Sequence, residues 1–218
     1  MNKCRFPLWP FFDLRVTTPR LELRYIDDDL GADLAALAAA GVHDPAFMPF
    51  AIPWTDFPSP QQEWQTQQFY WRCRADLSPT SWSINLATLV DGRVVGTTSL
   101  MGKDFPTVRQ FETGSWLGRA HQGSGIGKEM RIASLHLGFL GFEAVWATTG
   151  AFDDNGPSLG VTRSLGYTPK GHERTVRRGA SATTMRFEMA RADFEQRLQR
   201  DDIVLHGVEG CLPLLGLS

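Results

Sequence analysis

The stretch Gln122-Gly123-Ser124-Gly125-Ile126-Gly127 decides the fold, because it joins a predicted strand to a predicted helix. Residues 111–117 before it are typical of a strand, and residues 128–140 after it carry apolar side chains at helical spacing. The first turn of a helix has unpaired amides, and glycines there let an anion approach them closely. This turn is therefore a candidate phosphate site, although a tight turn without a ligand would also need such glycines.

Three phosphate-binding patterns can be compared with this turn letter by letter. A P-loop fits Gly127-Lys128 at its end, but Gln122 stands where its first glycine belongs and Glu129 where its hydroxyl belongs. The dinucleotide fingerprint G-x-G-x-x-G requires glycine at position 128 and a place after the first strand of a parallel sheet. Both patterns therefore fail, whereas Q-x-x-G-x-G is met in full by Gln122, Gly125 and Gly127.

The elements around the turn are predicted from periodicity and from residues that start or stop helices. Gly41 is predicted to end one helix, Ser59-Pro60 with Gln62 to begin the next, and Asp91-Gly92 to form a tight hairpin. Strands are expected at 20–26, 82–87, from 94 onward, at 111–117, 143–149, 167–174 and 182–190, and helices at 28–40, 59–74, 128–140, 157–165 and from 191.

The order of these elements predicts the sheet. Short connections favour antiparallel neighbours, whereas the strand, glycine turn, helix and strand over 111–149 imply a right-handed crossover and one parallel pair. The fold class is therefore α/β (α+β), with a mixed, largely antiparallel sheet of about seven strands and helices on both faces.

Composition excludes several classes of protein. The chain has 218 residues, 42% of them apolar and 21% charged, which disfavours a disordered or fibrous protein, and no run of 18 apolar residues could span a membrane. With 22 basic and 24 acidic residues it lacks the excess of positive charge typical of nucleic-acid binding. The first 16 residues do not match a signal peptide, so a cytoplasmic protein without a nucleic-acid or membrane partner is expected.

Cysteine and histidine, the residue types that most often bind metals or form disulfides, are scattered along the sequence. No metal-ligand spacing is present, so no metal is expected and the cysteines are expected to be reduced. His136 is expected to be a packing residue of its helix. The positions are Cys4, Cys73, Cys211, His43, His121, His136 and His172.

Through the Q-x-x-G-x-G pattern at 122–127, the chain resembles the GNAT superfamily of N-acyltransferases, in which this pattern binds the pyrophosphate of coenzyme A. The strand 112–117, Asn155-Gly-Pro-Ser158 and Ser164-Leu-Gly-Tyr167 stand where the family has matching signatures. The opening Thr18 to Arg24 resembles the RimJ/RimL-like branch, which acetylates ribosomal-protein N-termini. The chain also looks like a mycobacterial member associated with succinyl transfer, which implies an acyl group larger than acetyl.

The resemblance runs from about Thr18 to Arg191 and implies three segments. Residues 1–17 are expected to be an N-terminal extension, 18–191 the GNAT domain, and 192–218 a C-terminal helix and tail packed on it. It also implies a sheet splayed at the acyl-coenzyme A site. Residues expected to bind this co-substrate are Trp116, Leu117, Gly118, Arg119, Gln122, Gly123, Ser124, Gly125, Ile126, Gly127, Lys128, Asn155 and Ser158.

The same resemblance assigns roles in direct transfer of acetyl or succinyl from acyl-coenzyme A to a primary amine. Glu112 is the expected general base, and Ser158 the expected acid, although Thr162 replaces the tyrosine that many members use. A backbone amide near Trp116 or Leu117, exposed at a β-bulge, would bind the carbonyl oxygen. The acceptor pocket is expected in the proline-rich loop 43–58, lined by Phe47, Phe50 and Trp54.

Several points stay open in the sequence. Lys128 and Arg131 could reach phosphate, and a succinyl carboxylate could pair with Arg109, Arg119 or the pair Arg177-Arg178. The acceptor is undecided between a protein N-terminus, a lysine and a small amine, and exposed aromatic residues are compatible with a homo-oligomer.

Two other functions remain in view. A non-catalytic acyl-coenzyme A-binding module would share the fold and the turn. A serine hydrolase would use the G-x-S-x-G motif at 156–160 with Asp202 and His206, but six residues separate this motif from the preceding strand.

Overall fold

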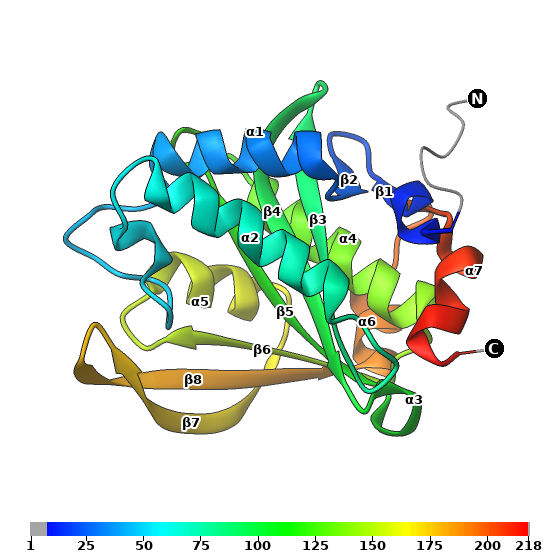
Figure 1. The fold of residues 1–218 in the computed structure, drawn as a ribbon. Coiled ribbons are helices and arrows are strands. Elements are labelled where there is room, and N and C mark those ends of the chain that lie inside the picture. The colour runs from blue at the N-terminus through cyan, green and yellow to red at the C-terminus, as the bar shows by residue number, and fades with distance from the viewer. Residues whose placement is uncertain (1–7, 218) are drawn as a thin grey trace.

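The computed structural model describes residues 8–217, which form one nine-stranded sheet with helices on both faces (Figure 1). The strand order is β7-β8-β6-β5-β4-β3-β2-β1-β9, and every neighbouring pair is antiparallel except β5 and β6. The strands are β1 (Arg15–Thr17), β2 (Glu22–Tyr25), β3 (Ser81–Val90), β4 (Arg93–Lys103), β5 (Gln110–Leu117), β6 (Trp146–Phe152), β7 (Thr168–Arg177), β8 (Ala180–Ala190) and β9 (Val204–His206). The predicted mixed, largely antiparallel α/β fold is therefore confirmed.

The helices divide between the two faces of the sheet. The α-helices are α1 (Asp28–Ala39), α2 (Gln61–Ala75), α3 (Phe105–Val108), α4 (Ile126–His136), α5 (Gly156–Ser164), α6 (Arg191–Arg197) and α7 (Val208–Cys211). Helices α1 and α2 cover one face, where Leu30, Leu34 and Tyr70 pack in a small cluster. Helix α4 covers the other face, where the larger core lies.

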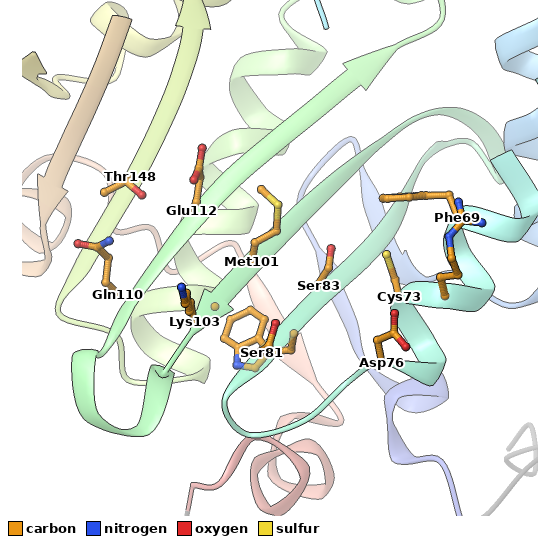
Figure 2. Close-up of a pocket in the computed structure, with 13 residues that line it drawn as sticks. Phe69, Cys73, Asp76, Ser81, Ser83, Met101, Lys103, Gln110, Glu112 and Thr148 are labelled. Atoms are coloured by element: carbon orange, nitrogen blue, oxygen red, sulfur yellow. The ribbon is translucent and has the colours of Figure 1, made fainter. Parts of the chain in front are cut away.

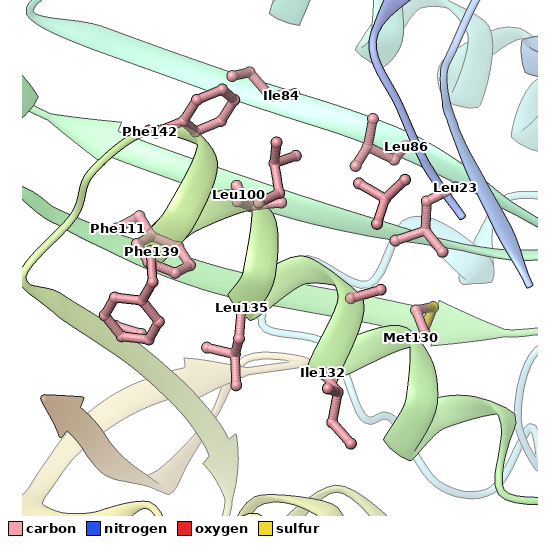
Figure 3. Packing of buried hydrophobic residues seen from close by; sticks show 14 of the residues in the cluster. Leu23, Ile84, Leu86, Leu100, Phe111, Met130, Ile132, Leu135, Phe139 and Phe142 are labelled. Carbon is pink, nitrogen blue, oxygen red and sulfur yellow. The ribbon is translucent and has the colours of Figure 1, made fainter. Parts of the chain in front are cut away.

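Alternation along the strands sends successive side chains to opposite faces. Ile84 and Leu86 of β3 reach the core under α4, whereas Ala87 and Leu89 belong to the cluster under α1 and α2. Figure 3 shows Phe111 of β5 beside Phe139 of the helical layer, and the two rings pack edge to face. Because both faces are covered, the residues of β3 from Ile84 to Leu89 are all buried, including the polar Asn85 and Thr88.

Two strands were missed by the sequence prediction, which expected about seven. Strand β1 pairs with β2 and also with β9, so residues 15–17 and 204–206 extend the sheet at one edge. Each has only three residues, too few for a period-2 pattern to be recognised. Phe11, Leu14 and Val16 are buried in the main core, although they precede the segment that resembles the family.

Local signals predicted helix and strand ends with mixed success. Asp91 and Gly92 both have positive φ at the tip of the β3–β4 hairpin, and Gly41 has a φ of 115° after α1, as expected. Ser59 is not the N-cap of α2, because Pro60 occupies that position and the Ser59 hydroxyl bonds Glu63 instead. The strand expected at 143–149 starts only at Trp146, and the strand expected from Arg20 starts at Glu22.

The parallel pair β5–β6 is short. Its register runs from Gln110↔Trp146 to Thr113↔Thr149 and stops there. Beyond that point β5 stays paired with β4 as far as Leu117, and β6 stays paired with β8 as far as Phe152. The two strands therefore part over their last residues, which is the splay that the resemblance implied.

A π-helical turn, Leu137–Gly141, continues α4 and brings its backbone against the sheet. A Cβ atom at Gly138 would lie 2.1 Å from the Phe111 ring, so this close approach requires glycine. The contact fixes the distance between α4 and β5, the two elements joined by the glycine turn.

Within residues 8–217, no helix is long and apolar enough to cross a membrane. In the same range Cys73 and Cys211 are free thiols, and Cys4 lies outside the described residues. Trp64 and Trp71 of α2 are exposed, and the homo-oligomer stays a prediction.

His136 joins α4 to the C-terminal segment. Its side chain is 1% exposed; Nδ1–H donates to Ile132 O at 2.9 Å, and Nε2 accepts from Arg200 N at 3.0 Å. Burial lowers the pKa of His136, because an imidazolium there would lose its water and Nε2 could no longer accept. The packing role predicted for His136 is confirmed.

This neutral histidine makes stability depend on pH. Its unfolded form takes up a proton below about pH 6.5 while its folded form does not, so the free energy of unfolding should fall as pH drops from 7 to 5. Replacing His136 with Gln removes this titration. In urea unfolding, the wild-type protein should have a higher free energy of unfolding than H136Q, and this difference should shrink by at most about 1.4 kcal/mol per pH unit as pH falls. A difference that stays constant from pH 7 to 5 would contradict the assignment of folded His136 as neutral.

Candidate active site

The site lies where β5 and β6 part. Helix α4 begins nine residues after the last residue of β5, and α5 begins at Gly156, shortly after β6 ends at Phe152. The N-termini of two helices therefore follow the carboxyl ends of the two diverging parallel strands. In open α/β sheets this edge is where ligands bind, because helix N-termini offer amides and positive potential there.

The glycine turn leaves its amides open. Gly123 and Gly125 have φ of 77° and 82°, and the space that a Cβ at Gly123 would occupy is empty to 4 Å. The first helical bond of α4 runs from Glu129 N to Gly125 O at 3.2 Å. Among residues 8–217, no acceptor is bonded to the amides from Gly123 to Lys128. They form a cradle suited to a diphosphate.

Gln122 holds this turn by its side chain. Its Nε2 donates to Val42 O at 2.7 Å and to Leu117 O at 2.9 Å, so both of its protons are used on backbone carbonyls. Gln122 thereby ties the end of β5 and the segment after α1 to the start of the turn. This geometry explains why glutamine opens the pattern without requiring its side chain to touch a ligand.

A second set of bonds fixes the first turn of α4. Glu129 accepts from the Thr18 hydroxyl at 2.6 Å and from Arg20 Nε at 2.7 Å. Burial alone would raise the pKa of Glu129, but these hydrogen bonds outweigh it and the pKa lies below its ordinary value. Thr18 and Arg20 belong to the turn between β1 and β2, so the resemblance at Thr18 to Arg24 has a structural counterpart here.

Glu112 is in the middle of β5, still within the paired part. Its Oε1 accepts from Arg186 of β8 at 2.8 Å, and the same guanidinium is bonded by Glu173 of β7. The Glu112 side chain is 41% exposed, and no other partner of it is found in residues 8–217. One carboxylate oxygen is therefore anchored, and the other remains available.

A cavity of about 550 Å³ begins at Glu112 and extends toward α2. Figure 2 shows Glu112 and Thr148 at one end and Cys73 and Asp76 of α2 at the other. Its lining is mixed: Phe69, Trp82 and Met101 are apolar, and Ser81, Ser83, Lys103, Gln110 and Arg72 are polar or charged. The sequence did not predict this cavity, because it forms between segments distant along the chain.

Asn155 and Ser158 begin α5. Asn155 is the N-cap, and its Oδ1 accepts from Ser158 N at 3.2 Å. Its Nδ2 and the Ser158 hydroxyl have no bonded partner in the part of the chain that the structure describes. Asn155 thus caps the helix with its oxygen and can still donate through its nitrogen.

The loop 43–58 covers the end of β5. Phe50 lies 5.2 Å from Trp54, and Trp54 lies 5.7 Å from Trp116 of β5, measured between ring centroids. Phe47 lies apart from this row, beneath Arg177 at 5.9 Å. The structure therefore joins Phe50 and Trp54 to Trp116 and leaves Phe47 beside the β7–β8 hairpin.

Three of the four arginine positions considered for a succinyl carboxylate already have carboxylate partners. Arg177 pairs with Asp154 at 2.7 Å, and Arg178 with Asp56. These hydrogen bonds lower the pKa of both aspartates. Arg109 lies 3.8 Å from Glu143. Arg119 is exposed next to the glycine turn and has no ion pair within residues 8–217.

The expected β-bulge at Trp116 and Leu117 is not there. The register of β5 with β4 is unbroken from Gly102↔Phe111 to Gly96↔Leu117, and the irregularity lies between β3 and β4 at Thr88 and Leu89. Amides of β5 are freed instead by the loss of β6, because the strands part without any extra residue.

Arg131 does not lie with the glycine turn. It is 5% exposed, and its guanidinium donates to Thr149 of β6 and Ser115 of β5 at 3.0 and 3.3 Å. Because these hydroxyls lie at and beyond the last backbone pair, Arg131 bridges the strands where they part. Lys128 is exposed on the first turn of α4, as a phosphate contact would require.

The serine hydrolase alternative is wrong. His206 is in β9, six strand spacings of about 4.8 Å each from β6, which precedes Ser158. Its Nε2 lies 3.3 Å from the Thr17 hydroxyl, and Asp202 pairs with Arg200. No triad can form. The described residues also contain no cluster of three metal-binding side chains.

Sequence reasoning missed three residues of this region. Arg186, Thr18 and Arg20 contact Glu112 or Glu129 through tertiary packing alone. Only Thr18 and Arg20 carried a signal, as part of the opening that resembles the ribosomal-protein branch.

Comparison with known proteins supports this fold. The family model described as an acetyltransferase (GNAT) domain matches residues 20–168. A GCN5-related N-acetyltransferase from Brucella melitensis aligns with a TM-score of 0.67 at 19% identity, covering 83% of this chain and 80% of its own. A GNAT-family acetyltransferase from Bacillus anthracis gives 0.65 at 16%, covering 82% and 99%.

A third similar structure is a complex with a ligand. The ribosomal L7/L12 alpha-N-protein acetyltransferase RimL, in complex with coenzyme A, aligns with a TM-score of 0.63 at 17% identity, covering 79% of this chain and 95% of its own. At such identities these structures support the fold alone. The family match covers more than half of the chain, and the protein therefore belongs to the GNAT acetyltransferase family.

Proposed function

We propose that this protein transfers an acyl group, acetyl or succinyl, from acyl-coenzyme A to a primary amine within a ternary complex. The observation that carries the proposal is the parting of β5 and β6 after Thr113 and Thr149, with the open amides of the glycine turn at the same edge. RimL, one of the similar structures, binds coenzyme A. A thioester in this gap would meet strand amides that no neighbouring strand occupies.

The glycine turn would hold the diphosphate, with Lys128 and Arg119 adding positive charge at the surface. The open space around Gly123 fits this group, because an oxygen can approach amides that have no Cβ before them. Asn155 Nδ2 is placed to donate to the pantetheine arm at the start of α5. No metal is needed for any of these contacts.

Glu112 is the proposed base. At pH 7 an α-amine must give up its proton at a cost of about 1 kcal/mol, and a lysine at about 4.6 kcal/mol, so a carboxylate is most useful for a lysine. Arg186 fixes one oxygen of Glu112, the other oxygen has no bonded partner within residues 8–217, and the residue lines the cavity. Bound acyl-coenzyme A supplies the activated carbonyl and the thiolate leaving group.

The proton inventory balances with two side chains. A protonated acceptor loses two protons. Glu112 passes the first to solvent as the neutral amine forms, and it accepts the second as the nitrogen bonds the carbonyl carbon and the carbon–sulfur bond breaks. Ser158, a half-buried residue at the start of α5, donates the proton of its hydroxyl to the departing sulfur. The hydroxyl then regains a proton from solvent.

The acceptor would approach on the α1–α2 face of β5. Glu112 and Trp116 share this face and are about 13 Å apart at 3.3 Å per residue. Gly114, between them, leaves the surface open, since a Cβ there would meet only Met101 Cε at 3.6 Å. The cavity at Glu112 and the aromatic pair Phe50 and Trp54 thus lie on either side of the path by which the acceptor would approach.

The catalytic roles can be tested by a double substitution. E112Q with S158A should lower kcat by about a hundredfold or more, because both proton transfers are lost, while coenzyme A affinity stays within about threefold of wild type. Steady-state assays with acetyl- and succinyl-coenzyme A and isothermal calorimetry measure the two effects.

A matched control comes from the same ion-pair cluster. Glu173 shares Arg186 with Glu112 but does not line the cavity, so E173Q should keep transfer within about threefold. Unchanged transfer in the double variant would refute the assigned roles. A wild-type chain that binds acyl-coenzyme A but acylates no amine in a panel would favour the non-catalytic binding module.

The diphosphate site is tested at Gly125. Valine there would add branched bulk beside Arg20 at the edge of the turn, whereas alanine imposes the same strain at a φ of 82° with less bulk. Calorimetry should show G125V binding coenzyme A at least about tenfold more weakly than G125A. Equal affinities would place the diphosphate elsewhere.

A further inference from the structure

Arg20 stands beside the glycine turn, although no pattern in the sequence assigned it to the site. Its Nη2 lies 2.6 Å from Glu129 Oε2, and its Nη1 donates to Ser124 O at 3.3 Å. The nearest heavy atom to a Cβ built at Gly125 is Arg20 Nη2, at 3.5 Å. The side chain is 53% exposed, so it borders the turn from the solvent side.

The charge of Glu129 would oppose a diphosphate. This carboxylate lies in the first turn of α4 and is only 10% exposed, so water screens it poorly. A diphosphate on the amides of residues 123–128 would bring further negative charge close to it. The guanidinium of Arg20, with two contacts to Glu129, offsets that repulsion before any ligand arrives.

The bond to Ser124 O sets the direction of an amide. In a trans peptide the carbonyl and the following N–H point in opposite directions. Because the Ser124 carbonyl points to Arg20, the Gly125 N–H points away from it, toward the open side of the turn. A turn without this anchor could rotate that peptide and bring a carbonyl oxygen to the anion.

We propose that Arg20 is a positioning residue for the anion cradle: it neutralises Glu129 and fixes the Ser124–Gly125 peptide so that the turn accepts the diphosphate of coenzyme A. This inference rests on the proposed function, because it assumes that the turn binds that group. It differs from a direct contact, in which Arg20 would pair with phosphate itself and Glu129 would be irrelevant.

Calorimetry of coenzyme A binding to the full chain separates these roles. R20M should weaken affinity about tenfold, and E129Q should stay within about threefold of wild type. The variant carrying both changes should recover at least half of the affinity that R20M loses, measured on a logarithmic scale, because the Glu129 carboxylate left unpaired in R20M is gone. The R20M defect should also shrink at 1 M salt, where the Debye length is about 3 Å.

T18V is the matched control. It removes the hydroxyl that donates to Glu129 Oε1 at 2.6 Å but keeps the charge pair, so it should lower the thermal midpoint and leave coenzyme A affinity within about threefold. If T18V binds as weakly as R20M, general loosening of the turn explains both and the inference is overturned.

The remaining outcomes are equally decisive. An R20M variant that binds like wild type overturns the inference alone, and a double variant as weak as R20M shows a direct phosphate contact instead. A wild-type chain that does not bind coenzyme A overturns the proposed function together with this inference. Circular dichroism on each variant confirms that affinities refer to folded protein.

Discussion

The loss of pairing between β5 and β6 is the constraint on which the rest of the site depends. Each strand keeps its other neighbour, β4 or β8, so the sheet stays continuous while a gap opens between them. Arg131 of α4 spans this gap by donating to hydroxyls of both strands. These two side-chain hydrogen bonds connect β5 and β6 where their backbone hydrogen bonds have ended. Beyond Thr113 and Thr149 the facing edges of β5 and β6 are therefore unpaired, while each strand is still held from its other side.

The N-terminus of α4 is held beside the gap between β5 and β6 by contacts that come from far along the chain. Gln122 ties the glycine turn to Val42 and Leu117, while Thr18 and Arg20 hold Glu129. The close approach of Gly138 to Phe111 sets the helix against the sheet. Because these bonds use side chains and carbonyls, they leave the amides of the turn open, and a rigid cradle costs little ordering when a ligand arrives.

The face of β5 toward α1 and α2, where the acceptor would approach, combines an ion pair with aromatic contacts. Glu112 is anchored by Arg186 and faces a mixed cavity, whereas Trp116 meets the aromatic residues of the loop 43–58. The hairpin tip at Arg177 and Arg178 pairs with Asp154 and Asp56, so it holds this loop in place. Arg177 and Arg178, which the sequence analysis considered as partners of a succinyl carboxylate, are instead bound to carboxylates of the protein itself.

The sequence by itself determined the glycine turn, the main strands and helices, and the single parallel pair, because these depend on periodicity, turn residues and connection length over short distances. It did not reveal the three-residue strands β1 and β9, whose pairing needs neighbours far along the chain. It also misplaced the β-bulge, since strands can part without an extra residue. Only the tertiary structure decided the partners of Glu112, Glu129 and Arg131, because ion pairs and cavities arise where distant segments meet.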